Sequence, residues 1–375
     1  MISMRIFSLL FAAVAALFPT QASMPTASSA RSGEAQVGHT LLLEGWIPFW
    51  AKASGTKEAL LHRELLSTVD PFSLEVNPDG TLFDRFASDG GLWGQFNASS
   101  STHKVKVVPT IAWFDPERID AILSSSTSRK AHITNIVAMV KSGHYDGVDI
   151  DYEGKWLRTR DAYSIFIREL ASALAPIGAS LRCTVEARTP AEDRSLQLPR
   201  EMSHASDYKV LNEACAAVRI MAYDQRDDDQ RLVYENGDVF YRPVADDVWV
   251  EKTIREALYE IDRKKLILGI PTYGNVYSAV KGKTHTIYTH VGAINYGDAL
   301  RRALYYGAIP FRNAAGELQF GYVKDKVQYY VSFTDAVAVK KKLLLAEKYG
   351  LLGVSLFKID GGMDKRIWTE LKSFI

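Results

Sequence analysis

The amino-acid sequence predicts an α/β protein built on a (β/α)8 TIM barrel with a small α+β insertion after the seventh strand. Eight short stretches with strand signals alternate with segments of helical periodicity. Acidic and aromatic residues recur where several of these stretches end, and barrels place their chemistry at that end of their strands. A doubly wound parallel sheet shows the same alternation, so the pattern alone leaves that architecture open.

The composition is that of an ordinary globular protein. Of the 375 residues, 47% are hydrophobic and 24% are charged. An α/β barrel commonly occupies about 250 residues or more as one unit, so the length does not require a second large domain. The formal net charge is +1 and no stretch is strongly basic, which argues against nucleic acid as a partner and allows a neutral or weakly charged substrate. We expect a monomer.

Residues 1–22 have the features of a secretory signal peptide. Arg5 supplies a positive charge, and the apolar run after it is too short to span a membrane as a helix. An uncleaved N-terminal anchor is the competing interpretation. Residues 23–38 are rich in Ser, Ala, Pro and Thr and are expected to form a disordered leader, followed by the barrel at residues 39–375. We therefore expect a secreted or periplasmic protein with no membrane span beyond the signal peptide.

Strand signals define the barrel along the chain. Strands are expected at Leu41–Pro48, Thr68–Ser73, Val105–Ala112, Gly147–Tyr152, Ser180–Ala187, Ala217–Tyr223, Leu266–Pro271 and Gly353–Phe357. Between them, apolar residues repeat three or four positions apart, as in amphipathic helices, and the C-terminal helices have start and stop signals. The helical stretches include Ile133–Val140, Tyr163–Leu174, Val250–Ile261, Thr334–Tyr349 and Ile367–Phe374.

The connection after the seventh strand is too long for a plain loop. Between Tyr273 and Tyr330 it contains strand-like stretches and a helical pattern over Asp298–Tyr306. Since a structureless loop of this length is unusual, we expect a small α+β insertion at about residues 275–330.

The chain contains only two cysteines, Cys183 and Cys215. Export would permit a disulfide, but a chain of this length does not need one for stability, and Cys183 lies mid-strand, where a small buried hydrophobe is usual. We expect two free buried thiols. The histidines show no convincing metal spacing, because His285 and His290 lack a third partner. No metal or organic cofactor is expected.

Three acidic residues, Asp149, Asp151 and Glu153, alternate with apolar residues at the end of the fourth strand. Successive side chains of a strand point to opposite faces, and residues two apart are about 6.6 Å apart along its axis. The three carboxylates therefore line one face and raise one another's proton affinity. A calcium loop or a solvated edge would also be acidic, but the interleaved residues are Val, Ile and Tyr, which are strand formers.

The stretch Asp146-Gly147-Val148-Asp149-Ile150-Asp151-Tyr152-Glu153 resembles the D-G-x-D-x-D-x-E motif of glycoside hydrolase family 18 at every fixed position. This family contains chitinases, peptidoglycan-active enzymes and inactive lectins. The resemblance extends from about residue 40 to the end of the chain and implies a barrel rather than a doubly wound sheet. It also supports the insertion, because many members carry one there as a wall of the substrate cleft.

The resemblance implies substrate-assisted hydrolysis, in which the carbonyl oxygen of the substrate's N-acetyl group attacks the anomeric carbon. An oxazolinium-type intermediate would form and water would open it with retention. Glu153 would protonate the leaving oxygen, and the negative charge of its neighbours would keep it protonated near neutral pH. Asp151 would hydrogen-bond the acetamido N–H. Asp149 would share a proton with Asp151 and tune it, or would be a purely supporting polar residue of the core.

The stretch Met221-Ala222-Tyr223-Asp224 closes the sixth strand and resembles the M-x-Y-D element of the same family. Tyr223 would donate its hydroxyl to the acetamido oxygen and fix it for attack. Asp224 would contact the sugar or brace the carboxylate row, and Met221 is assigned to substrate binding.

Aromatic residues at the strand ends are expected to line a glycan cleft, because flat apolar sugar faces stack on rings that carry a polar edge. Those assigned to substrate binding are Trp46, Trp50, Trp113, Tyr273 and Phe357. Two stretches depart from the chitinase pattern: the third strand lacks the S-x-G-G element, and Phe357 stands where a tryptophan normally floors the site. The eighth strand looks more like the spore-cortex and cell-wall branch.

We therefore expect a retaining glycoside hydrolase, of chitinase or N-acetylglucosaminidase type, that cleaves β-1,4 linkages of N-acetylglucosamine-containing glycans, either chitin or peptidoglycan. The alternative is a non-catalytic, lectin-like glycan-binding protein of the same fold. Such lectins usually lose the terminal Glu or an Asp of the acidic row, and all three acids are present here.

Overall fold

The structure is a computed structural model that describes residues 40–86, 91–100, 102–193, 204–237, 239–283 and 285–375. The expected signal peptide and the expected leader lie outside these described residues.

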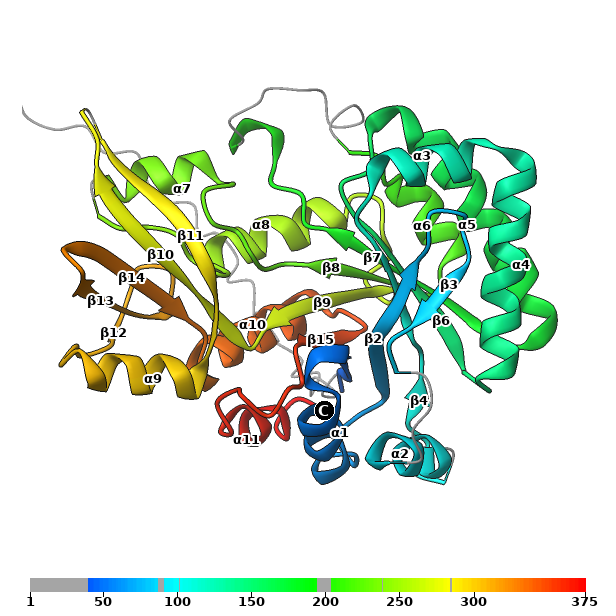
Figure 1. Cartoon of the computed structure of the whole chain (residues 1–375), viewed down its shortest axis with the longest axis horizontal. Helices are drawn as coiled ribbons and strands as arrows, with labels where there is room; N and C mark the ends of the chain where they lie inside the picture. Colours follow the sequence, from blue (N-terminus) through cyan, green and yellow to red (C-terminus); the bar gives the residue numbers. More distant parts are fainter. Residues whose placement is uncertain (1–39, 87–90, 101, 194–203, 238, 284) are drawn as a thin grey trace, which may run out of the picture. The chain divides into compact units, whose positions relative to one another are not determined.

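Parallel strands close into a barrel at the centre of the described chain (Figure 1). Its eight strands are β1 (Leu42–Pro48), β2 (Thr68–Val76), β5 (Thr110–Trp113), β6 (Gly147–Tyr152), β7 (Ser180–Glu186), β8 (Ala217–Met221), β9 (Leu266–Pro271) and β15 (Gly353–Phe357). Strand β1 pairs in parallel with both β2 and β15, so the last strand meets the first. Two short strands, β3 (Leu82–Asp84) and β4 (Lys106–Val107), pair only with β2. The predicted (β/α)8 barrel is confirmed.

Helices follow the strands, and most of them cover the outside of the barrel (Figure 1). They are α1 (Lys52–Leu61), α2 (Leu92–Ser100), α3 (Pro116–Ser124), α4 (Ser126–Ser142), α5 (Arg160–Leu174), α6 (Tyr208–Ala214), α7 (Gln230–Glu235), α8 (Asp247–Ala257), α10 (Ala336–Tyr349) and α11 (Ile367–Leu371). Helix α10 shows how the sequence sets such bounds. The Asp335 side chain accepts the Ala338 N–H at its start, and Gly350 ends it with φ 61°, a left-handed conformation that favours glycine.

Strand β6 orients the acidic row, because its apolar residues face the surrounding helices. Val148, Ile150 and Tyr152 are fully buried in the core between strands and helices. The Tyr152 ring stacks on Phe166 of α5, and its hydroxyl lies 2.6 Å from His132 Nε2 of α4. Because side chains alternate along a strand, this packing turns the alternate residues of β6 into the barrel.

A second sheet lies between β9 and α10, at the place in the chain where the α+β insertion was expected. It is antiparallel, with the order β11-β10-β14-β13-β12. Its elements are β10 (Tyr273–Lys281), β11 (Thr286–Asn295), α9 (Tyr296–Tyr305), β12 (Phe311–Arg312), β13 (Leu318–Lys324) and β14 (Val327–Phe333). A small core of its own, with Phe320, Val331 and Phe333, packs α9 against the sheet.

The prediction of two free thiols is wrong. Cys183 and Cys215 form a disulfide, with their Cα atoms 6.2 Å apart. Cys183 lies on the outward face of β7, and Cys215 directly follows α6, the helix that leads into β8. Because β7 and β8 are paired neighbours, this βαβ turn brings both sulfur atoms into the same buried layer. The sequence separation of 32 residues did not reveal that proximity.

Within the described residues, no helix is both long enough and apolar enough to cross a bilayer.

Candidate active site

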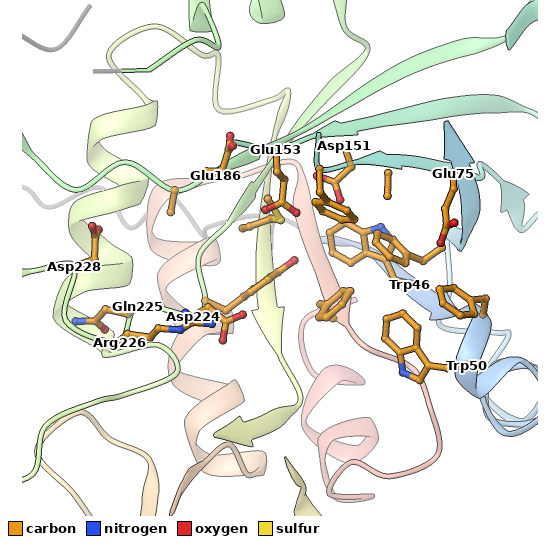
Figure 2. Close-up of a pocket in the computed structure, with 18 of the residues that line it drawn as sticks. Trp46, Trp50, Glu75, Asp151, Glu153, Glu186, Asp224, Gln225, Arg226 and Asp228 are labelled. Carbon is orange, nitrogen blue, oxygen red and sulfur yellow. The ribbon is translucent and has the colours of Figure 1, made fainter. Parts of the chain in front are cut away.

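The acidic row lies along β6, with its members at increasing height in the barrel. Asp149 is fully buried, Asp151 is 3% exposed, and Glu153 is partly exposed just after the strand ends. Figure 2 shows Glu153 between Asp151 and Glu186, with its carboxyl group turned toward Asp224. The row therefore runs from the barrel interior to its mouth, as the alternation predicted.

Asp149 is held by donors from three other strands. It accepts hydrogen bonds from the Thr110 hydroxyl at 2.9 Å, from the Thr184 hydroxyl at 2.9 Å, and from Arg219 Nη1 at 3.0 Å. A buried carboxylate with this many partners is well fixed in position. Asp149 does not line the cavity that opens above the row, and it lies beneath the site.

Burial raises the pKa of Asp151 well above its ordinary value. The negative charges of Glu153 and Asp149 add to this rise. Burial is also the largest cause for Glu153, followed by the charge of Glu186, and together they raise the pKa of Glu153 to about 7. A carboxyl group that keeps its proton close to neutral pH can serve as a general acid.

Tyr223 lies two residues after the end of β8 and lines the same cavity as Asp151 and Glu153. Its ring stacks on Phe357 with the ring centres 5.4 Å apart. Burial and the charges of Asp151 and Glu153 raise the pKa of the Tyr223 phenol well above its ordinary value. The hydroxyl therefore stays protonated and is available as a hydrogen-bond donor.

Asp224 has φ 55°, a left-handed conformation that residues other than glycine seldom adopt. This conformation turns the chain across the mouth of the barrel, where Asp224 accepts a hydrogen bond from Asn275 of β10 at 3.0 Å. Arg226 also has a left-handed backbone, with φ 52°. The loop after β8 thus brings charged side chains back over the barrel.

A cavity of about 760 Å³ opens above the row. The predicted site residues that line it are Trp46, Trp50, Asp151, Glu153, Met221, Tyr223, Asp224 and Phe357. A second cavity of about 1090 Å³ borders the inserted sheet and is lined by Tyr273, another predicted residue. Both cavities are lined by Trp50, Asp224, Arg226 and Phe357, so they adjoin across these residues. This is room for several sugar units in a row.

Comparisons with known proteins identify this arrangement. The family model described as glycosyl hydrolases family 18 matches residues 46–362. The chain belongs to this family. The resemblance seen in the acidic motif is thereby confirmed, and family membership supports glycoside hydrolase activity.

The chain is also similar to individual known proteins. It is 25% identical over 262 residues to the uncharacterized glycosylase YvbX of Bacillus subtilis, covering 69% of this chain and 70% of that protein. The chitinase of Chromobacterium violaceum has a similar structure, with TM-score 0.71 and 19% identity, covering 88% of this chain and 98% of the other. The spore cortex-lytic enzyme SleL of Bacillus cereus also has a similar structure, with TM-score 0.71 and 20% identity, covering 90% of this chain and 75% of the other. At these identities the structural likeness concerns the fold alone.

One aromatic residue assigned to substrate binding lies elsewhere. Trp113 is 5% exposed and packs on Tyr152 and His132 in the core outside the barrel, and it lines neither cavity. The cause is the phase of β5, because Ala112 faces the cavity and its neighbour must face away. We therefore assign Trp113 to the core.

Sequence reasoning missed residues of two kinds in this family-18 site. The first kind lines the first cavity and includes Phe72, Glu75, Gln225, Arg226 and Asp228. Phe72 could have been found, because it lies one residue before the end of the predicted second strand. The second kind is a set of charged side chains beneath the row, comprising Glu44, Asp70, Arg182 and Arg219. Their alternation with apolar residues was the available signal.

The described residues contain no group of three or more His, Cys, Asp or Glu side chains arranged to hold a metal ion.

Proposed function

We propose that this family-18 protein is a secreted, retaining hydrolase that cleaves β-1,4 linkages of N-acetylglucosamine-containing glycans with the help of the substrate's own acetamido group. The observation that carries the proposal is the position of Glu153 at the barrel mouth, with a pKa of about 7, in the cavity that Asp151 and Tyr223 also line.

In the proposed reaction, Glu153 gives its proton to the glycosidic oxygen while that oxygen leaves the anomeric carbon. The acetamido oxygen forms the new bond to the anomeric carbon from the opposite face. Asp151 accepts a hydrogen bond from the acetamido N–H, and the Tyr223 hydroxyl donates to the acetamido oxygen, so that both groups hold it in line. Water then attacks the anomeric carbon, Glu153 takes a proton from it, and the acetamido oxygen is released.

The aromatic residues of the cavity supply the sugar-binding surface. Phe357 stacks between Tyr223 and the edge of Trp46, and Trp50 is 55% exposed at the mouth, where a sugar face can cover its indole ring. The alternation of apolar rings and carboxylates in one cavity suits a neutral sugar, which presents apolar faces and hydroxyl edges.

The substrate is proposed to be chitin or peptidoglycan. Among the similar structures, one is named a chitinase and another a spore cortex-lytic enzyme. Secretion is supported by the features of residues 1–22 and by the buried disulfide between Cys183 and Cys215, because disulfides persist mainly in oxidising compartments.

The proposal is tested by mass spectrometry of products from chitin oligomers and from purified peptidoglycan, run side by side. Wild-type protein should release new reducing ends from at least one substrate, and Glu153→Gln should release none while keeping its fold. Glu169→Gln is the matched control, since it makes the same chemical change on the outside of the barrel, where Glu169 pairs with Arg129. It should cleave like the wild type. Binding of glycan by the wild type without any turnover would favour the lectin-like alternative.

A further inference from the structure

The barrel interior beneath the acidic row is charged, although barrels are usually filled there by branched apolar side chains. Glu44 and Asp70 are fully buried, and Arg219 is 1% exposed. Placing charges in such an interior is costly unless they are paired, and apolar residues of similar volume would serve stability equally well. Fold stability alone therefore gives no reason for this cluster.

Arg219, on β8, joins the cluster to the active site. Its Nη2 group bonds Glu44 and Asp70, with 3.0 Å to the Asp70 carboxylate. Its Nη1 group points the other way and donates to Asp149 at 3.0 Å. Its guanidinium also lies 4.1 Å from the ring centre of Trp46, which lines the cavity. Among the described residues, no other cation forms an ion pair with Asp149.

We propose that Arg219 is a positioning residue of this hydrolase, which holds Asp149 as an anion so that the proton shared within the acidic row stays on Asp151. This inference rests on the proposed function for its meaning in catalysis, but its physical content can be tested without a substrate.

The hydrogen bonds around Asp149 all run toward it. The Trp46 indole N–H donates to the Thr110 hydroxyl oxygen at 3.0 Å, so that the Thr110 hydroxyl directs its own proton to Asp149. On the other side, Arg219 Nη1 lies 3.3 Å from the Thr184 oxygen, and the Thr184 hydroxyl donates to both Asp149 oxygens at 2.9 Å.

A guanidinium cannot accept a hydrogen bond, so it leaves no place for a proton on the Asp149 oxygen that faces it. The other oxygen of Asp149, Oδ1, accepts from the Thr184 hydroxyl, so donors face both oxygens and favour the ionised carboxylate. Asp151 differs, since its buried Oδ1 atom has no hydrogen-bond partner in the structure. The negative charge of Asp149 is one of the causes that raise the pKa of Asp151, after burial and the charge of Glu153. Asp151 therefore enters the reaction as the neutral acid beside Glu153.

Charged or titratable groups reach the surroundings of Asp149 from several elements. They are Glu44 of β1, Asp70 of β2, Asp151 of β6, Arg182 of β7, Arg219 of β8 and Tyr163 of α5. Arg182 is the useful contrast. It is buried in the same barrel and bonds Glu44 and Thr68, but it makes no bond to Asp149. Its removal takes away the same charge without uncovering Asp149.

The first test measures unfolding by urea between pH 4 and pH 8 in Arg219→Met, Arg182→Met, and each of them combined with Asp149→Asn. In Arg219→Met, Asp149 is buried without its cation and favours its proton in the folded state. The stability this proton gives is present at acid pH and lost as the pH rises, so the urea midpoint should fall with pH more steeply than in the wild type. Adding Asp149→Asn should remove the part of the extra slope that comes from Asp149 and leave the part that comes from Asp70, because Arg219 also lowers the pKa of Asp70. Arg182→Met should show no such dependence on Asp149.

An extra slope of the same size in Arg219→Met and in the Arg219→Met/Asp149→Asn double variant would overturn the proposal, because Glu44 and Asp70 would then be its whole source. If Arg219→Met alone does not fold, recovery of folded protein in the double variant is the expected result, and failure of both variants also contradicts the proposal. None of these measurements depends on glycan cleavage, so a failure of the proposal for Arg219 can be told apart from a failure of the proposed function.

The second test is the pH profile of glycan cleavage. Loss of the guanidinium should move the acid limb of the profile upward by about one pH unit or more, because a neighbouring opposite charge typically shifts a carboxyl by one to three units. Arg219→Lys keeps the charge and should restore the limb even where the turnover number stays low. A purely structural Arg219 would lower turnover in both variants and leave the limb where the wild type has it.

Discussion

Glu153 should destabilise the folded protein when it is ionised, so Glu153→Gln should become more stable than the wild type as the pH rises. The pKa of Glu153 is raised in the folded state to about 7 from 4.5. Such a group contributes stability below its unfolded pKa and loses it as the pH rises through the folded pKa. A rise of this size corresponds to about 3 kcal/mol, fully developed above neutral pH.

The measurement is the free energy of unfolding in urea for both proteins at pH 4, 6, 7 and 8. Near pH 4 both side chains are neutral, and the two proteins should differ little. At pH 8 the free energy of unfolding of the variant should exceed that of the wild type by roughly 2 to 3 kcal/mol, since the amide carries no charge to bury. Glu169→Gln is the control, because Arg129 holds the pKa of Glu169 below its ordinary value. The ionised Glu169 therefore stabilises the folded protein, and Glu169→Gln should be less stable than the wild type at pH 6, 7 and 8. A difference between Glu153→Gln and wild type that stays constant with pH would refute the assigned environment of Glu153.

Further predictions concern turnover and the disulfide. The catalytic rate should fall about tenfold for each pH unit above about 7, because Glu153 must carry a proton; a rate constant up to pH 9 would contradict this. Tyr223→Phe should lower kcat by about 10²- to 10³-fold with a small change in KM, measured on chitin oligomers, since only the hydroxyl that meets developing charge is lost; a change confined to KM would contradict this role. Replacing Cys183 and Cys215 by serine should cost about 3 to 4 kcal/mol of unfolding free energy for a loop of 32 residues, and it should leave cleavage by the folded protein unchanged; an unaltered urea midpoint would argue against the bond.

Most of what could be predicted from the sequence depends on the alternation of side chains along single strands. The spacing of Asp149, Asp151 and Glu153 fixes their common face on any strand, and the apolar residues between them fix which face is outside. The same logic placed Tyr223 beside the row, at the end of the strand two further along the barrel. These features depend on neighbours in the sequence, and the structure has them as expected.

What could not be predicted depends on contacts across the closed barrel. Glu44 and Arg219 are 175 residues apart in sequence, and only closure of the sheet brings them together. The disulfide between Cys183 and Cys215 likewise required the pairing of β7 with β8, which brings the end of α6 close to Cys183. Trp113 illustrates the opposite error, because its place at a strand end suggested the cleft while its phase on β5 directs it to the core.

The most direct test of the account is the anomeric form of the first product, followed by NMR during cleavage of N-acetylated oligomers by the wild-type protein. Attack by the substrate's acetamido oxygen followed by water inverts the anomeric carbon twice, so the product should first appear as the β-anomer and only later equilibrate. A product that first appears as the α-anomer would mean that water attacks directly, and it would contradict the roles assigned to Asp151 and Tyr223.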